Sequence, residues 1–443
     1  KKKKKCAPKI DTTIGTEYDS TVGQGGLVWL KERSSVGSLR YHSFFDTARG
    51  TAKAIYSNTT DAQGSTAGVT AFNANGFTLG NTNIVNQNTA HFVSWTFRKA
   101  PKFFDVISID VADPEPTSVT VNHNLGQEVG MVIMKPYLHT YPWYVWHRSI
   151  GANYSLELNS TANKSYVGGS GFSSTSTTIT IPGAFVHSGS NNGKCILYLF
   201  SHNNNDGEFG PDADQDVIKC GSYTGNNSTD GPTINLGFEP QWLFIKHTDA
   251  AGNSSFILDN MRGVVTGGND ASLSPNASND EQTSSDLVEF NATGFQLKRA
   301  NDNVNGSGNT YIYMAIRRGP LAAPEDATKV FSIDTLGTSA PYFDSNHIVD
   351  MGLVKQTGAA SSWFVYTRLV GEKNFYTDFT AAENNASEAG FDFMNGHIDS
   401  NWGGTNSYSW MWKRAPGYFD VVAYTGTGSA RTVPHGLTVP PEM

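Results

Sequence analysis

The chain has few cysteines, few charged residues and no long hydrophobic run. Its three cysteines, Cys6, Cys195 and Cys220, form no C-x-x-C pair, which argues against a disulfide-built secreted scaffold and against a structural zinc site. We expect Cys195 and Cys220 to be small buried residues. No apolar stretch approaches the length that spans a bilayer, so we expect no membrane insertion.

The sequence also lacks an excess of positive charge. Its net charge is −8, which disfavours nucleic acid as a partner. The five lysines at residues 1–5 are not followed by an apolar segment, so they do not form a signal peptide. G-x-S-x-G, H-E-x-x-H and P-loop motifs are missing, and we therefore assign no catalytic residue and no cofactor. The paired carboxylates of a glycoside hydrolase stay open, because their separation in space is invisible in a sequence.

Glycine, aromatic and small polar residues are abundant instead. The chain has 45 glycines, and aromatic residues make up 12% of it while charged residues make up only 16%. This composition is typical of short strands joined by polar turns. No stretch has the periodicity of an amphipathic helix of three turns, so we predict an all-β fold.

One stretch of the sequence occurs twice, at residues 94–106 and 409–421. Seven of its thirteen positions are identical between the two copies. Degraded copies at residues 196–211 and 311–320 keep the aromatic strand and the proline. A unit of roughly a hundred residues is therefore repeated about four times. Because proline ends strand pairing, we place a module boundary after each copy.

The repeat divides the chain into four modules and the start of a fifth. Short strands with frequent turns predict a β-sandwich or jelly roll in each module. A module of this size is large enough to fold alone, so we expect a tandem array of separate beads and not one large core. The predicted bounds are 1–103, 104–214, 215–328 and 329–417, with residues 418–443 opening a truncated fifth module. Because that copy stops mid-pattern, we expect the natural polypeptide to continue beyond it.

Each module contains an apolar strand that ends in a lysine, and these lysines are spaced by 104, 111 and 109 residues. They are Lys31, Lys135, Lys246 and Lys355. Continuous apolar runs are typical of strands that are buried on both faces. We expect each lysine to mark the point where its strand meets water. Trp95 and Trp410 of the repeated stretch should be buried against the lysine strands of their own modules.

The first and third modules share two further motifs. D-x-x-R-G occurs at residues 46–50 and 259–263, and F-N-x-x-G-F occurs at residues 72–77 and 290–295. A glycine turn between aromatic residues predicts a hairpin. An aspartate and an arginine three positions apart predict a local ion pair that closes a turn, and a functional acid beside a cation is the rarer alternative.

Taken together, several motifs resemble an uncharacterised β-rich repeat module. They are G-L-V-W-L-K at 26–31, the two motifs above, W-x-F-R-K-A-P at 95–101, F-D-V-V-x-Y-T-G at 419–426 and T-V-x-H-x-L at 120–125 and 432–437. That module is found in structural proteins of tailed bacteriophages, especially marine phages and cyanophages. The resemblance covers nearly the whole chain after about residue 20. It implies a virion appendage and supplies no catalytic residue.

Asp212, Asp214 and Asp216 form the densest carboxylate cluster in the sequence. Alternate positions offer oxygen ligands of the kind that calcium prefers. The glycine and the distal glutamate of an EF-hand loop are missing, however. We therefore favour a solvated loop between modules and keep a metal site as the alternative.

Tyr141 and Trp143 are aromatic residues that the repeat pattern does not require. If exposed, they would offer a platform on which a host-surface glycan stacks. Residues 144–146 align with apolar positions in every module and are expected in the core. His123 and His435 lie in the T-x-x-H-x-L loops, where we favour hydrogen bonding within a turn.

We expect a non-enzymatic structural component of a bacteriophage virion, a tail, neck or capsid fibre at the particle surface. Its partners would be other virion proteins and a host-surface glycan. The alternative is a carbohydrate-binding or depolymerising tailspike. A string of sandwiches is a poor rigid rod, so we expect a homotrimer. Its subunit contacts should include Tyr141, Trp143, Trp402 and Tyr408.

Overall fold

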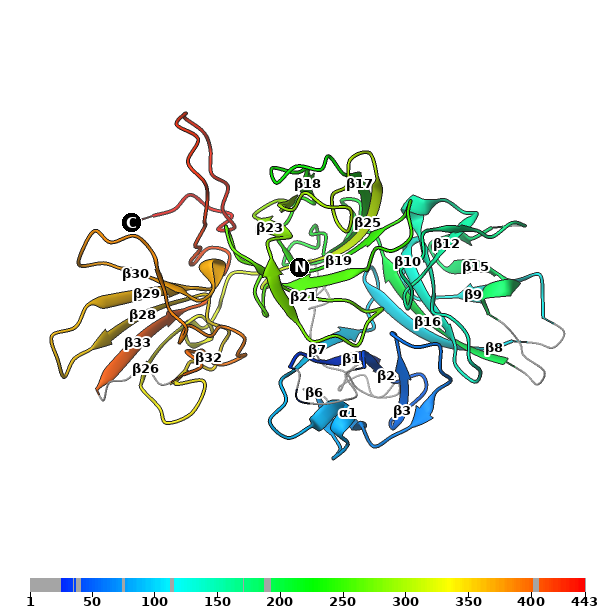
Figure 1. Cartoon of the computed structure of the whole chain (residues 1–443), viewed down its shortest axis with the longest axis horizontal. Helices are drawn as coiled ribbons and strands as arrows, with labels where there is room; N and C mark the ends of the chain where they lie inside the picture. The colour runs from blue at the N-terminus through cyan, green and yellow to red at the C-terminus, as the bar shows by residue number, and fades with distance from the viewer. Residues whose placement is uncertain are drawn as a thin grey trace, which may run out of the picture.

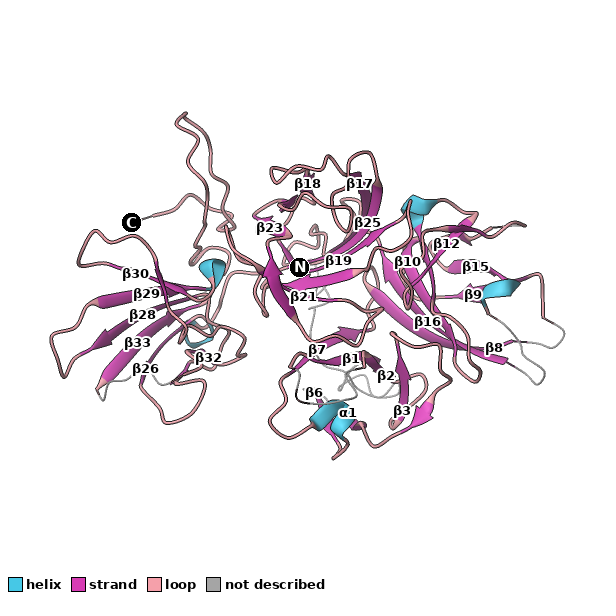
Figure 2. Cartoon of the chain, viewed as in Figure 1, coloured by secondary structure: helices cyan, strands magenta, loops and turns pink. Residues whose placement is uncertain are grey.

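The computed structural model describes residues 25–34, 36, 41–73, 76–111, 115–169, 171–186, 193–400 and 406–442. Antiparallel strands dominate this part of the chain, as Figure 2 shows. Its longest helix, α1 (Asn83–Asn86), has only four residues. The predicted all-β, multi-module fold is confirmed.

The second module has one large sheet and one small sheet. The large sheet has the order β13-β12-β11-β10-β16-β8, and the small sheet has the order β14-β15-β9. The strands of the large sheet are β8 (Phe104–Val111), β10 (Val129–Pro136), β11 (Tyr144–His147), β12 (Tyr154–Glu157), β13 (Ser165–Tyr166) and β16 (Gly193–Ser201). Those of the small sheet are β9 (Ser118–Asn122), β14 (Ser173–Ser174) and β15 (Thr178–Pro182).

The third module repeats this strand order. Its large sheet runs β17-β25-β19-β20-β21-β22, and its small sheet runs β18-β24-β23. The large sheet contains β17 (Ile218–Thr224), β19 (Pro240–His247), β20 (Phe256–Asp259), β21 (Asp270–Leu273), β22 (Gln282–Ser285) and β25 (Thr310–Arg317). The small sheet contains β18 (Thr233–Asn235), β23 (Val288–Asn291) and β24 (Gly294–Leu297).

The fourth module has the same order again, β26-β33-β28-β29-β30-β31, with the pair β27-β32 beside it. Its strands are β26 (Phe331–Thr335), β27 (Phe343–Asp344), β28 (Met351–Gln356), β29 (Trp363–Thr367), β30 (Lys373–Tyr376), β31 (Asn384–Asn385), β32 (Gly396–His397) and β33 (Ser407–Trp412). In all three modules the last strand lies between the first strand and the lysine strand.

The described part of the first module follows the same plan. Its large sheet runs β4-β3-β2-β1-β7, and β5 pairs with β6. These strands are β1 (Gly26–Glu32), β2 (Ser43–Asp46), β3 (Lys53–Tyr56), β4 (Gly64–Ser65), β5 (Val69–Asn73), β6 (Gly76–Leu79) and β7 (Phe92–Arg98). The F-N-x-x-G-F motifs form hairpins as predicted, with Phe72 opposite Phe77 and Phe290 opposite Phe295.

The lysine strands of the first three modules are buried on both faces because alternate side chains enter different cores. In β1, Val28 and Leu30 pack in the core of the first module, whereas Trp29 points to the opposite face of the sheet. In β19, Leu243 packs in the core of the third module and Phe244 points the other way.

The opposite faces of the first three large sheets share one hydrophobic core. It contains Trp29 from the first module, Tyr198 from the second and Phe244 from the third. Phe97 contacts both Phe200 and Trp242, with ring centroids 5.5 and 5.9 Å apart. The expectation of separate beads is therefore wrong for these three modules. Figure 1 shows them grouped together, with the fourth module at the left.

Candidate functional site

The predicted metal cluster does not converge. Asp212 and Asp214 are exposed, whereas Asp216 is buried. The Asp216 carboxylate accepts the N–H groups of Asn205 and Gly207 and pairs with Lys219 at 3.2 Å. Within the described ranges, no group of three or more His, Cys, Asp or Glu side chains is arranged to hold a metal ion. Asp216 instead stabilises the conformation of the loop between the second and third modules.

The predicted glycan platform is not available at Trp143. Its side chain is 0% exposed, and its indole N–H donates to Tyr56 O in the first module at 2.8 Å. Phe44, also from the first module, packs against it with ring centroids 4.8 Å apart. Tyr141 is partly exposed, and its carbonyl accepts a hydrogen bond from Lys135. Trp143 is thus a contact between modules of one chain.

The other aromatic residues predicted at contacts have mixed positions. Tyr408 is exposed on β33, and Trp402 lies outside the described residues. Trp95 is buried and stacks edge-on against Trp29 of its lysine strand, as predicted. Trp410 pairs with Leu353 of its lysine strand but stays partly exposed, so the prediction of its burial is wrong.

Three of the strand lysines are buried, which contradicts the expectation that they meet water. Lys135 and Lys246 are 0% exposed, and burial lowers the pKa of each to about 8. Each ammonium group donates to a carbonyl of the preceding module, Lys135 to Thr60 O at 2.8 Å and Lys246 to Ser160 O at 2.9 Å. The lysine strand ends at a neighbouring module, and the charge is satisfied there.

Three equivalent backbone hydrogen bonds join the first three modules in a closed ring. In each bond, the carbonyl two residues beyond the strand lysine accepts an N–H from another module. The bonds run from Gln63 N to Tyr137 O (2.8 Å), from Lys164 N to Thr248 O (2.9 Å) and from Glu281 N to Arg33 O (2.9 Å). The first module contacts the second, the second contacts the third, and the third contacts the first. We call this arrangement the three-module ring.

A side-chain contact at the end of the strand that follows the lysine strand also recurs around the ring. Tyr198 donates its hydroxyl to Asp46 of the first module at 2.7 Å. Trp95 donates its indole N–H to Asp259 of the third module at 2.9 Å. Tyr198 and Trp95 occupy the same register position, opposite the residue two before the strand lysine. One contact of the ring therefore joins an aromatic donor to the aspartate of a D-x-x-R-G motif.

The second module departs from that motif, and its contact changes accordingly. His147 replaces the aspartate, and Met314 of the third module replaces the aromatic donor. Because methionine has no N–H or O–H to give, the His147 Nε2–H donates to Tyr313 O at 3.1 Å, while Nδ1 accepts from Ser149 N. Burial lowers the pKa of His147 to about 3. The imidazole is therefore neutral at physiological pH.

The D-x-x-R-G arginines close their turns as predicted. The Nε atoms of Arg49 and Arg262 donate to Asp46 and Asp259, each at 2.7 Å. Burial alone would raise the pKa of Asp259, but the Arg262 charge and the Trp95 N–H outweigh it and lower that pKa below its usual value. The Asp259 carboxylate is thus held charged inside the ring, and Asp46 makes the equivalent ion pair with Arg49.

A charge network extends this contact toward the fourth module. Arg262 pairs with Glu281 at 2.7 Å, and Glu281 also pairs with Arg33 of the first module at 2.7 Å. Arg33 reaches Asp392 of the fourth module at 2.5 Å. Arg414 of the fourth module binds both oxygens of Glu239 at 2.8 Å, which is the bidentate geometry that arginine prefers.

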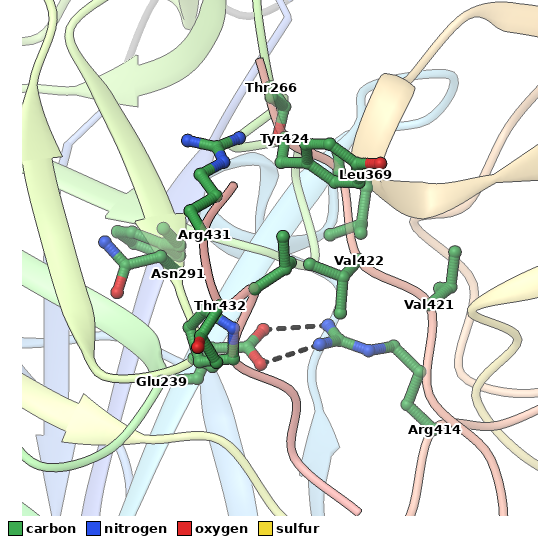
Figure 3. A pocket seen from close by; sticks show the side chains of 15 residues that line it. Glu239, Thr266, Asn291, Leu369, Arg414, Val421, Val422, Tyr424, Arg431 and Thr432 are labelled. Carbon is green, nitrogen blue, oxygen red and sulfur yellow. Dashed lines mark hydrogen bonds and ion pairs between the residues drawn. The ribbon is translucent and has the colours of Figure 1, made fainter. Parts of the chain in front are cut away.

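A cavity of about 150 Å³ lies where the third module meets the C-terminal segment. Figure 3 shows Glu239 held by Arg414 on one side of it, with Tyr424 and Arg431 on the other. The Arg431 guanidinium lies 5.2 Å from the Tyr424 ring. Glu239 is the one carboxylate in the lining, and two arginines, Arg414 and Arg318, already pair with it. The carboxylate of this cavity is therefore already held in ion pairs between the third and fourth modules and the segment that joins them.

The histidine loops behave as predicted. His123 accepts the N–H of Leu125, and His435 accepts the N–H of Leu437, at 3.3 and 3.2 Å. Cys195 and Cys220 are free and buried, also as predicted, and burial raises the pKa of both thiols. Cys6 lies outside the described residues.

Sequence reasoning missed the contacts between modules. Lys135, Lys246 and Trp143 all bind carbonyl oxygens of another module, and a carbonyl has no residue-type signature. One sequence signal for these contacts was present. It is the D-x-x-R-G motif shared by the first and third modules, whose aspartates take part in two of the three side-chain contacts of the ring.

The profile of a family described as a domain of unknown function, DUF7483, matches residues 12–320. That span is well over half of the chain and ends where the three-module ring ends. No curated protein and no solved structure matches the chain. Among the described residues, no helix is both long and apolar enough to cross a membrane.

Proposed function

We propose that this chain, which belongs to the DUF7483 family, is a non-enzymatic structural component of a bacteriophage virion. It would form a fibre or appendage on the tail, neck or capsid, at the particle surface, and bind other virion proteins. The motif resemblance at residues 26–31, 95–101 and 419–426 is the observation that carries the proposal.

The use of the polar side chains supports a structural role. The buried aspartates Asp46 and Asp259, the buried lysines Lys135 and Lys246, and His147 all bond to neighbouring modules. Groups that an enzyme would leave free to react with a substrate are committed here to holding modules together. A rigid unit of this kind suits a projecting appendage.

The test is to locate the protein on intact particles. Antibody raised against the purified chain and coupled to gold should decorate one defined appendage of purified phage in negative-stain electron microscopy. Particles treated with antibody that was pre-absorbed with the chain are the control. Antigen found in infected cells but not on purified particles would overturn the proposal.

A carbohydrate-binding or depolymerising tailspike is the second candidate. The observation that favours it is the pair of partly exposed tryptophans Trp363 and Trp410, whose rings lie 5.6 Å apart on the fourth module. Incubation of the purified chain with host polysaccharide, followed by size analysis of the polysaccharide, separates the two. Unchanged length is expected for a structural protein, and shortening would establish a depolymerase.

A further inference from the structure

The fourth module contains the same sheet face that the first three modules bury at the centre of the ring. Leu353 lies opposite Trp410 on one side and Val365 on the other. In the first module, Trp29 lies opposite Trp95 and Phe44 in the same register. The shared strand order therefore identifies, residue by residue, which face of the fourth sheet corresponds to the ring centre.

This face is covered in the first three modules and open in the fourth. At the three equivalent positions the first module has Trp29, Phe44 and Trp95, all buried. Their counterparts in the fourth module, Leu353, Val365 and Trp410, are all partly exposed. Ile333, on the adjacent strand β26, is 54% exposed, whereas Val106 at the same register in the second module is buried.

The other face of the large sheet of the fourth module is buried in the core of that module. Val354, Tyr366 and Met411 alternate with the open residues and are each 0% exposed in the core of the module. The fold of the module is therefore complete on one side. A row of large apolar residues that alternates with a finished core marks an interaction surface.

The ring shows what covers such a face. In the first three modules each face packs against two other modules of the same fold, and the contacts between modules are equivalent and cyclic. A head-to-tail contact of this kind closes after three members. We propose that the face formed by Ile333, Leu353, Val365 and Trp410 is covered by the fourth modules of two further copies of this chain, giving a homotrimer.

The backbone partners that the proposal requires are present and exposed. The ring acceptor lies two residues beyond the strand lysine, which is Thr357 in the fourth module. In the first three modules, the N–H donor of the ring bond lies eight residues after Ile55, Leu156 and Leu273, respectively. Phe375 has the same register position in the fourth module as these three residues have in theirs. Glu383 is therefore the donor, and both Thr357 and Glu383 are exposed. The trimer joins Glu383 N–H of one copy to Thr357 O of the next.

A copy of the same chain covers this face, because modules of the same fold cover the equivalent face in the ring. Lys355 already donates to Ser361 O of its own module, six residues on, as Lys135 does to Tyr141 O. Lys135 also donates to the neighbouring module, and Lys355 in the trimer does the same. The inference deepens the proposed function by supplying symmetry to the appendage, but its test reads molecular mass and not particle location.

The first experiment measures the mass of the full chain by light scattering after size-exclusion chromatography. The expected mass is three times 47.9 kDa at micromolar concentration. Ile333→Lys should reduce it threefold to that of the monomer, because the side chain is already solvent-facing in one chain and its charge would be buried in the trimer. Tyr166→Lys, at a 68% exposed position of the second module, is the matched control and should stay trimeric.

The second experiment tests the geometry. A chain carrying both Thr357→Cys and Glu383→Cys should form covalent dimers and trimers under mild oxidation, since a backbone hydrogen bond brings the two positions within disulfide reach. All of these variants also carry Cys6→Ser, and each single variant should stay uncrosslinked, because the remaining native cysteines, Cys195 and Cys220, are buried. A monomeric parent chain overturns the trimer. If the Ile333→Lys chain stays trimeric and the double variant does not crosslink, the proposed surface is not the one that joins the copies.

Discussion

The hydroxyl of Tyr198 is one atom that joins two modules. It donates to Asp46 at 2.7 Å, and both residues are 0% exposed. Tyr198→Phe removes this hydrogen bond to a charged acceptor and leaves the ring packing in place. We expect it to lower the free energy of unfolding by about 1–3 kcal/mol in urea titrations. Tyr166→Phe, at an exposed ring, should change nothing. Equal stability of the Tyr198→Phe and parent chains would contradict the role of this bond.

Acid should weaken the contact between the second and third modules. Burial lowers the pKa of His147 to about 3, whereas an unfolded histidine titrates near 6.5. Between these values the unfolded chain binds more protons, so stability is complete above about pH 6.5 and falls as the pH drops toward 3. The loss is about 1 kcal/mol per pH unit for each such histidine.

Unfolding measured between pH 7 and pH 4.5 tests this expectation. His147→Gln keeps an N–H donor for Tyr313 O but does not titrate, so its stability should fall less steeply than that of the parent. His202 and His397 have pKa values lowered to about 4 and about 3 by burial, and they keep part of the slope in both chains. Identical slopes would exclude His147 as a source of the acid sensitivity.

Local roles were predictable at the residue scale, and contacts between modules were not. The Asp46–Arg49 pair and the His123 turn follow from spacings of two or three residues. The burial of Trp143 and Lys135 depends on carbonyl oxygens about 75 to 90 positions away in the chain. A backbone acceptor leaves no trace in residue type, so these side chains were interpreted as exposed.

Single strands in this molecule serve two cores. Trp95 on β7 packs against Trp29 of its own module, lies under Arg262 at 5.3 Å and donates to Asp259 of the third module. Trp95→Ala should therefore cost about 3–5 kcal/mol. The loss should spread to the third module and leave the fourth nearly unchanged.

Hydrogen exchange followed by mass spectrometry resolves the effect of Trp95→Ala by element. Faster exchange is expected in β7, β1 and β20, with unchanged protection in β28 and β33. A loss confined to the first module would return the picture to separate beads. An equal loss in the fourth module would mean that the ring and the fourth module unfold as one unit.

The equivalent strands could be identified from the repeats, because each copy contains the same lysine strand, but the order of the strands within the sheets could not. Burial of the lysine strand on both faces was correctly predicted from its continuous apolar run in the first three modules, but not in the fourth, where Leu353 of β28 stays partly exposed. The modules that cover the second face of the lysine strands could not be predicted. The donors of the ring bonds, Gln63, Lys164 and Glu281, occupy equivalent positions but have chemically different side chains. Equivalence of this kind is visible only in the folded register.

At the scale of the whole molecule, the ring and the fourth module should separate under protease. Residues 322–329 are almost all exposed, whereas the junction near residue 103 is buried beside Phe103 and Phe104. We expect the first cut of the folded chain in 318–329, which leaves a stable fragment of the three-module ring. The predicted bound at 103 should resist cleavage. Early nicking at 103, seen by mass spectrometry of the fragments, would contradict the closed ring.

The backbone hydrogen bonds between modules affect how many copies of such a chain associate. The three ring bonds use backbone N–H and C=O groups, which a module carries whether it lies on the same polypeptide or on another one. Three modules on one chain satisfy each other and require no companion. In the proposed trimer, the open face of the fourth module is covered by the fourth modules of two further copies of the chain.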